Sequence, residues 1–140
     1  MSESLERIEK FLQKHHVLTL ATCAEGEVSA CSLFYAYDAT CQRFIVASAD
    51  ETTHIRHILQ NPRVAGNIPL ETKIVGKIQG VQFRGLFAHA KEEARTIYFK
   101  RFPYALAMQP KLWEIKVDFF KMSDNTLGFG EKVIWQETSL

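Results

Sequence analysis

The stretch that decides the fold covers residues 44–64 and reads FIVASADETTHIRHILQNPRV. Its first residues are β-branched and aromatic, which favours a β-strand. Its second half sets Ile55, Ile58 and Leu59 on one side of an amphipathic helix, which Asn61-Pro62 ends. A hydroxyl-rich turn without lysine or arginine lies between them. The stretch therefore predicts a strand, a turn and a helix in direct succession.

The turn has two interpretations. It is a phosphate site if the free N–H groups and positive dipole end of the helix N-terminus bind an anion, with Thr52 and Thr53 as hydroxyl donors. It is only a helix cap if these side chains serve the helix itself. Asp50, Thr52 and Thr53 are favoured N-cap residues, and Ser48-x-x-Glu51 fits a capping box. Local sequence alone favours the cap.

Outward from this stretch, hydrophobic periodicity predicts short strands and a few helices. Strands are expected at residues 17–23, 28–38, 43–48, 63–68, 73–90, 112–124 and 131–137, and further helices at 4–16 and 91–102. Ser4 is expected to cap the first helix, whose buried face would hold Leu5, Ile8, Phe11 and Leu12.

Two turns and three glycines refine this order. The turn at Glu25-Gly26 predicts a hairpin in which Cys23 pairs with a residue near 28. Gly76, Gly80 and Gly85 interrupt the long fifth strand, which indicates bulges or close backbone approach.

The order of elements does not alternate β-α-β-α, which disfavours a doubly wound parallel sheet. Antiparallel strands that leave no open edge tend to close. The chain of 140 residues suits one domain that buries roughly 70% of its unfolded surface. We therefore expect a single domain over residues 1–140, mostly β with helices (α+β): a small barrel of about six strands with about three helices packed outside.

Composition and charge argue against several functional classes. The formal net charge of +1 gives no broad attraction for nucleic acid, and the sequence has no secretory signal and no run of about 20 apolar residues that would cross a membrane. Cys23, Cys31 and Cys41 are odd in number and form no CxxC pair. They are expected to be free thiols in a reducing cytoplasm.

Catalytic motifs are absent from the sequence. His54 and His57 share a helical face, but no third or fourth ligand follows at zinc spacing, so we expect no metal and a solvated helix face. No cysteine has a histidine beside it in the sequence to act as a base, and GxSxG, P-loop and GxGxxG motifs are missing. The residues alone name no reaction.

The ordered set of motifs adds a family resemblance. SLFYAYD, FIVAS, the hydroxyl-rich turn, its helix, NPRV and then GVQFRG resemble the FMN-binding split-barrel superfamily, typified by pyridoxamine 5'-phosphate oxidase. The resemblance covers residues 5–136, and within the superfamily the chain is similar to small bacterial proteins of the YhbP type. It implies a six-stranded antiparallel split barrel with about three flanking helices, and a homodimer with the flavin site between subunits.

The resemblance also implies a cofactor site. The flavin ring would lie along the strand that contains Ser32, Leu33 and Phe34, and Ala47 with Ser48 would contact the flavin chain. A Ser-Arg-Lys step holds the phosphate in the family, and Thr52, Thr53 and His54 stand at these positions. Gln79 is the nearest match to a glutamine at the ring edge, and Trp135 is a candidate C-terminal aromatic contact.

This chain departs from the family pattern at both phosphate-binding cations. Each charge-assisted bond contributes about 1.5–3 kcal/mol, so FMN binding is expected to be weaker by roughly two to four decades. Arg56 would restore part of that loss, and the charged form of His54 would favour binding at mildly acidic pH.

Ala30 stands where the family has an arginine, so pyridoxamine phosphate oxidation is not carried over. Two classes stay open. One is an FMN-dependent oxidoreductase, and the other is a non-catalytic protein that binds haem, another planar ligand or no cofactor.

Overall fold

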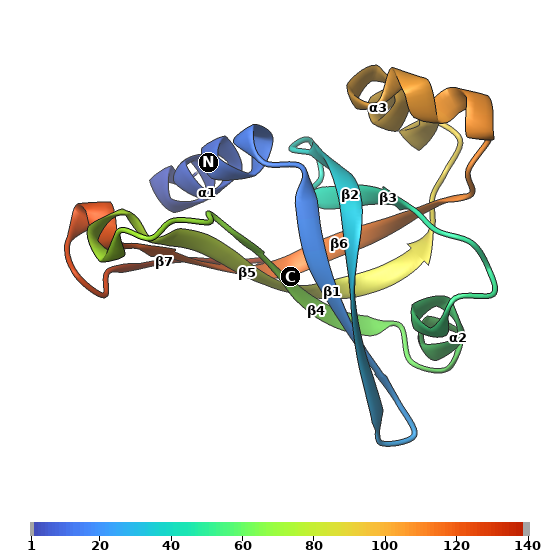
Figure 1. Cartoon of the computed structure of the whole chain (residues 1–140), viewed down its shortest axis with the longest axis horizontal. Helices are drawn as coiled ribbons and strands as arrows, with labels where there is room; N and C mark the ends of the chain where they lie inside the picture. The colour runs from blue at the N-terminus through green and yellow to red at the C-terminus, as the bar shows by residue number, and fades with distance from the viewer. Residues whose placement is uncertain (1, 139–140) are drawn as a thin grey trace.

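The computed structural model describes residues 2–138, which are mostly β with three α-helices (Figure 1). The strands are β1 (Val17–Ala24), β2 (Glu27–Asp38), β3 (Arg43–Ala47), β4 (Arg63–Pro69), β5 (Gln79–His89), β6 (Leu112–Asp124) and β7 (Lys132–Gln136). The α-helices are α1 (Glu3–Lys14), α2 (Thr53–Gln60) and α3 (Ala94–Arg101). Short 3-10 helices are η1 (Val75–Lys77), η2 (Pro103–Met108) and η3 (Asn125–Leu127).

The strands form one antiparallel sheet that closes on itself. Its order is β3-β2-β1-β4-β5-β6-β7, and β3 pairs additionally with β6. β3 pairs with residues 112–116 of β6, and β7 pairs with residues 119–123 along the same edge of β6. Six strands thus make a ring, which confirms the expected split barrel, and the full sheet has seven strands because β7 continues beyond it.

An aromatic cluster fills the ring. The Phe44 side chain lies in its middle, with ring centroids 5.0 Å from Tyr35, 5.2 Å from Tyr37, 4.8 Å from Phe83 and 6.1 Å from Phe120. Helix α1 adds to this core the buried face that the sequence predicts, Leu5, Ile8, Phe11 and Leu12.

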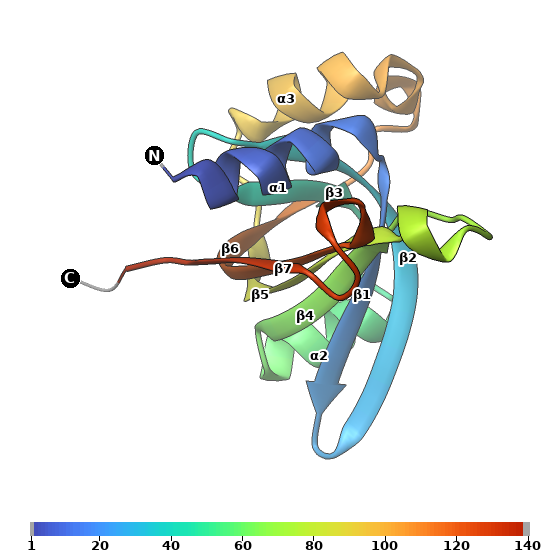
Figure 2. The ribbon, with the colours of Figure 1, turned by 90° about the vertical axis from the view of Figure 1, so that its left-hand side faces the viewer.

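The helices lie on two sides of the barrel. Figure 2 shows α1 and α3 over one side and α2 on the opposite side, beside the β1–β2 hairpin. The hairpin register pairs Cys23 with Val28, as its Gly turn predicts. No helix in residues 2–138 is both long and apolar enough to cross a membrane.

Two local expectations are corrected, and a third is confirmed. Ser2, not Ser4, caps α1 through a 3.0 Å bond from the Leu5 N–H to its Oγ, because the cap must stand three residues before that N–H. The fifth strand begins at Gln79, since η1 occupies the segment around Gly76. The bulge expected at Gly85 is present, as a register shift between Arg84 and Gly85.

Gly66 on β4 predicts a sharp stability difference. A Cβ there would lie closer than 3.0 Å to the Thr19 carbonyl oxygen and to the Phe83 ring, whereas one at Gly76 would meet open space. Gly66→Ala is expected to destabilise the protein by about 1–3 kcal/mol, and Gly76→Ala by less than about 0.5 kcal/mol. Urea unfolding of both variants measures this, and equal midpoints would contradict the close approach at Gly66.

Candidate functional site

The turn between β3 and α2 is anchored to strand β6. The indole Nε1 of Trp113 donates to the Ser48 carbonyl at 3.0 Å, and the Ser48 N–H donates to the Lys111 carbonyl at 3.1 Å. These bonds continue the β3–β6 pairing by one residue. The position of the turn is therefore fixed by ring closure.

Helix α2 begins at this turn without a side-chain cap. Thr52 is the N-cap residue, and its hydroxyl donates to the Ala49 carbonyl at 2.9 Å instead of accepting from the first helical turn. The capping box expected from Ser48 and Glu51 does not form, because the Ser48 hydroxyl bonds to His54. The N–H groups of the first turn consequently have no capping side chain.

Two cationic side chains lie near the turn. Arg56 Nη2 lies 3.3 Å from the Thr53 hydroxyl, one helical turn from the N-cap, where sequence reasoning expects it. Lys111 Nζ lies 2.9 Å from the Asp50 carboxylate and 4.9 Å from the centre of the Trp113 ring. Sequence reasoning missed Lys111, because only the β3–β6 pairing brings it to residues 48–50.

Both histidines of α2 are buried, which corrects the expected solvated helix face. His54 Nδ1 lies 3.4 Å from Cys31 Sγ, and its Nε2 lies 2.5 Å from Ser48 Oγ. His57 Nδ1 lies 2.9 Å from the Thr22 hydroxyl, and its Nε2 lies 3.1 Å from the Glu27 carboxylate. The histidines thus turn toward the β1–β2 hairpin, and Leu59 is left 69% exposed.

These contacts also change the role expected of His54. Burial, and to a lesser degree the neighbouring His57, lower the pKa of His54 below its ordinary value, so the ring is neutral at pH 7. Both of its nitrogens bond inside the protein. The ring is therefore not a free cation facing a phosphate, and the acid-favoured binding expected from the sequence loses its basis. The Cys31 thiol also lies beside the His54 imidazole, a contact that the spacing of the sequence does not reveal.

The residues expected beside the flavin ring divide between two faces of β2. Ser32 and Phe34 are exposed, whereas Leu33 is half-buried and packs against the core. Phe34 contacts the edge of Phe102 at 5.7 Å between centroids and stacks on His16 at 6.0 Å. Ala47 is half-buried at the end of β3.

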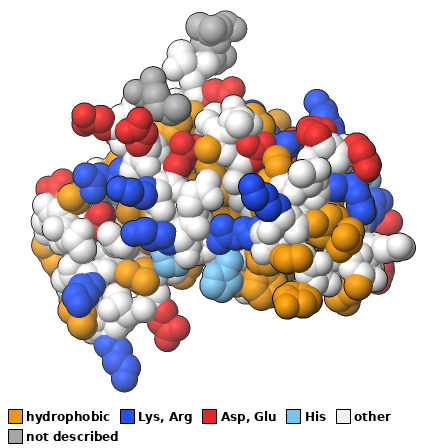
Figure 3. Space-filling view, turned by 90° about the horizontal axis from the view of Figure 1, so that it is seen from above, with side chains coloured by type: hydrophobic (Ala, Val, Ile, Leu, Met, Phe, Trp, Pro, Cys, Tyr) orange, Lys and Arg blue, Asp and Glu red, His pale blue; other side chains and the backbone are white. Residues whose placement is uncertain are grey.

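An apolar hollow adjoins the exposed Phe34. Figure 3 shows hydrophobic side chains gathered over the end of the molecule that α3 and η2 form. Tyr104 and Met108 are 94% and 82% exposed there. The hollow is lined by Phe34, Tyr98, Arg101, Phe102, Pro103, Tyr104, Ala105 and Met108.

Gln79 lies away from these groups within one protomer. It pairs with Asp124 at the start of β5. The other end of β5, at His89, stacks on Trp113 beside the turn. The 11 residues of β5 separate the two ends by roughly 30 Å. One protomer does not bring Gln79 to the turn.

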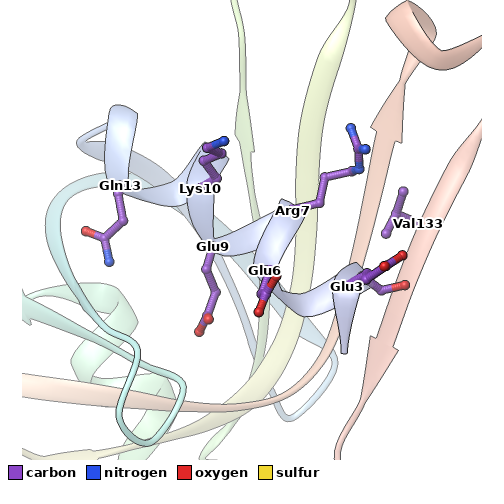
Figure 4. A pocket seen from close by; sticks show the side chains of 8 residues that line it. Glu3, Glu6, Arg7, Glu9, Lys10, Gln13 and Val133 are labelled. Atoms are coloured by element: carbon purple, nitrogen blue, oxygen red, sulfur yellow. The ribbon is translucent and has the colours of Figure 1, made fainter. Parts of the chain in front are cut away.

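A second hollow follows the exposed face of α1 (Figure 4). Its lining alternates acidic and basic side chains of one helix, with Val133 of β7 at the edge. Such a face is typical of a solvated helix. Among residues 2–138, no three histidine, cysteine or acidic side chains are placed to hold a metal ion.

A family profile and curated relatives both match most of this chain. The sequence profile described as pyridoxamine 5'-phosphate oxidase matches residues 4–121. The UPF0306 protein YhbP of Salmonella arizonae is 38% identical over 141 residues, which covers 98% of this chain and 96% of that protein.

Two solved structures share the fold. A haem-binding protein from Mycobacterium smegmatis superimposes with a TM-score of 0.79 at 18% identity, covering 97% of this chain and 59% of that one. An FAD-binding protein from Mesorhizobium loti superimposes with a TM-score of 0.72 at 16% identity, covering 87% of this chain and 92% of that one.

The His57 contacts predict a measurable role for Thr22. Thr22→Val keeps the side-chain shape but removes the partner of a buried imidazole nitrogen. We expect a loss of about 1–3 kcal/mol in the free energy of unfolding. Thr19→Val, at a half-buried threonine of the same strand, is the control and should change stability by less than about 0.5 kcal/mol. Chemical denaturation decides, and matching losses in both variants would argue against the His57 bond.

Proposed function

Because the chain belongs to the pyridoxamine 5'-phosphate oxidase family, we propose that it binds FMN, with the phosphate at the start of α2 and the ring against the outer face of β2. The observation that carries this proposal is the uncapped N-terminus of α2 with Arg56 held against Thr53. Free N–H groups, the positive helix end and a nearby guanidinium form an anion site.

Thr52, Thr53 and His54 have different roles at this proposed phosphate site. In the proposal, Thr53 offers its hydroxyl and N–H, while the N–H of His54 belongs to the same first turn. The His54 ring instead keeps Ser48 in place through the 2.5 Å bond. Both family cations are replaced in this chain. Arg56 is the cation proposed to contact the phosphate, while Lys111 is paired with Asp50, which keeps the expected affinity low.

Near the α2 start, the protein has surfaces that suit the ring and the chain of the flavin. Phe34 and the apolar hollow next to it suit a planar aromatic ring, and Ser32 offers a hydroxyl on the same exposed face. β2 covers roughly 10 Å between Cys31, which touches the α2 start, and Phe34. Ala47 and Ser48 lie at the end of β3, where the flavin chain would pass.

Bound flavin would supply redox chemistry, for which the protein provides orientation and electrostatics. We propose an oxidoreductase of the FMN-dependent class acting on a small molecule, with no side chain of this chain assigned to catalysis. Ala30 leaves the flavin strand without the arginine of the family pattern, so the substrate is not proposed to be a pyridoxamine phosphate.

The second candidate is a non-catalytic protein that holds haem or another planar ligand. The apolar hollow favours it, because that surface is far less polar than the turn and suits a flat apolar ring without a phosphate. The fold is shared with a haem-binding protein. A Soret band after addition of haem, without any response to FMN, would support this candidate.

A homodimer completes the proposed site. In the proposal, Gln79 reaches the flavin from a second copy, because the length of β5 separates it from the turn of its own protomer. The exposed Tyr104 and Met108 supply apolar surface for such contact. We expect sedimentation velocity at micromolar protein to give twice the chain mass of 16.0 kDa. A single species of monomer mass at that concentration would exclude this arrangement.

Fluorescence titration tests FMN binding. Adding the protein should quench FMN fluorescence with a Kd in roughly the micromolar range or weaker, since one cation replaces two. Arg56→Gln should weaken binding by roughly tenfold, because it removes a charge-assisted contact. Lys77→Gln, which changes an exposed cation on η1, is the matched control. FMN binding that is absent, or that is insensitive to Arg56→Gln, would refute the proposed phosphate site.

A further inference from the structure

Three side chains from three different elements form a row beneath the α2 start. Cys31 comes from β2, His54 from α2 and Ser48 from the end of β3. The Cys31 Sγ lies 3.4 Å from His54 Nδ1, and His54 Nε2 lies 2.5 Å from Ser48 Oγ. A nucleophile, a base and a group that orients the base have this order in covalent catalysts.

One arrangement of these hydrogen bonds makes His54 the acceptor of the thiol proton. In it the Thr52 hydroxyl donates to the Ala49 carbonyl, Ser48 Oγ donates to Thr52 Oγ1 at 3.4 Å, and His54 Nε2–H donates to Ser48 Oγ. A neutral imidazole carries one proton, so its Nδ1 lone pair faces Cys31.

The protonation states agree with this assignment. Burial first, and then the charge of His57 on the same helix, lower the pKa of His54, which keeps the ring neutral near pH 7 and so able to accept a proton. The other titratable group that faces the ring is Cys31 on β2. Burial raises the pKa of the Cys31 thiol, so this thiol is protonated and needs a base to react.

We propose that Cys31 is a nucleophilic thiol that small hydroperoxides oxidise, with His54 as the general base. The Cys31 sulfur attacks the outer oxygen of R–O–OH while its proton passes to His54 Nδ1. An S–O bond forms, the O–O bond breaks, and the proton leaves His54 with the departing alkoxide as ROH. The sulfur loses two electrons to the peroxide and becomes a sulfenic acid.

The other cysteines lack this arrangement and serve as internal controls. Cys23 is exposed on β1, where it pairs with Val28. Cys41 Sγ lies 3.5 Å from the Asp38 carboxylate, and burial followed by this charge raises the pKa of its thiol. Cys31 pairs with Leu20, three rungs of the ladder from Cys23, or roughly 10 Å. A disulfide between them does not form at that distance.

The test measures sulfenic acid at each cysteine of the full chain. Hydrogen peroxide is added in the presence of dimedone, and labelled peptides are quantified by mass spectrometry over time. Cys31 is expected to react at least about tenfold faster than Cys23, although Cys23 is more exposed. His54→Gln should slow Cys31 by about tenfold or more and leave Cys23 unchanged. His16→Gln, the same change at an exposed histidine after α1, should leave the Cys31 rate unchanged.

A pH profile separates general-base action from a packing role. In the native protein the Cys31 rate should rise as His54 loses its proton and level off by about pH 7, whereas a thiol that reacts without a neighbouring base should keep reacting faster as the pH rises further, and Cys23 is the comparison for this. Ser48→Ala keeps the base and should lower the Cys31 rate only a few fold. These readouts are independent of FMN binding.

Two results would overturn the proposal. One is a Cys31 rate no higher than that of Cys23 in the native protein. The other is a Cys31 pH profile that follows thiol ionisation both with and without His54. If His54→Gln does not fold, the native protein and Ser48→Ala serve for the test. A Cys31 rate no higher than that of Cys23, or a Cys31 pH profile that follows thiol ionisation, then overturns the proposal.

Discussion

The pairing of β3 with the first half of β6 is the contact on which the other features depend. It turns an open sheet into a ring, and five backbone pairs from Arg43 to Ala47 define it. Arg43 reinforces the pairing from within, since its guanidinium lies 2.9 Å from Asp38 on β2 and 3.0 Å from Glu114 on β6. The same pairing places residues 48–50 beside Lys111 and Trp113, where the proposed phosphate site begins.

The orientation of α2 depends on a second constraint, its two buried histidines. Buried polar groups are tolerated only when they are hydrogen-bonded, and each of these rings bonds through both nitrogens to a different element. Both bind the β1–β2 hairpin, and His54 also binds the turn. One rotation of the helix satisfies all of these bonds. The uncapped helix start and the thiol–imidazole pair therefore have a common structural origin.

The sequence predicted those features that depend on neighbouring residues alone. The Gly turn sets the Cys23–Val28 register, and the 3.6-residue period sets the buried face of α1. Non-local pairing decided the rest. The proximity of Cys31 to His54, and of Lys111 to Asp50, arises only after β2 and β6 have joined the ring. Leu59 was expected inside, but His54 and His57 have hydrogen-bonding partners on the hairpin and take the buried positions instead.

In the proposed function, the α2 start binds the phosphate of a flavin. Calorimetric titration of the native protein with FMN and with riboflavin isolates that contribution, because the two ligands differ only in the phosphate. The account predicts that FMN binds at least about tenfold more tightly than riboflavin and that added salt reduces the difference. Equal affinities for the two ligands at low salt would contradict it.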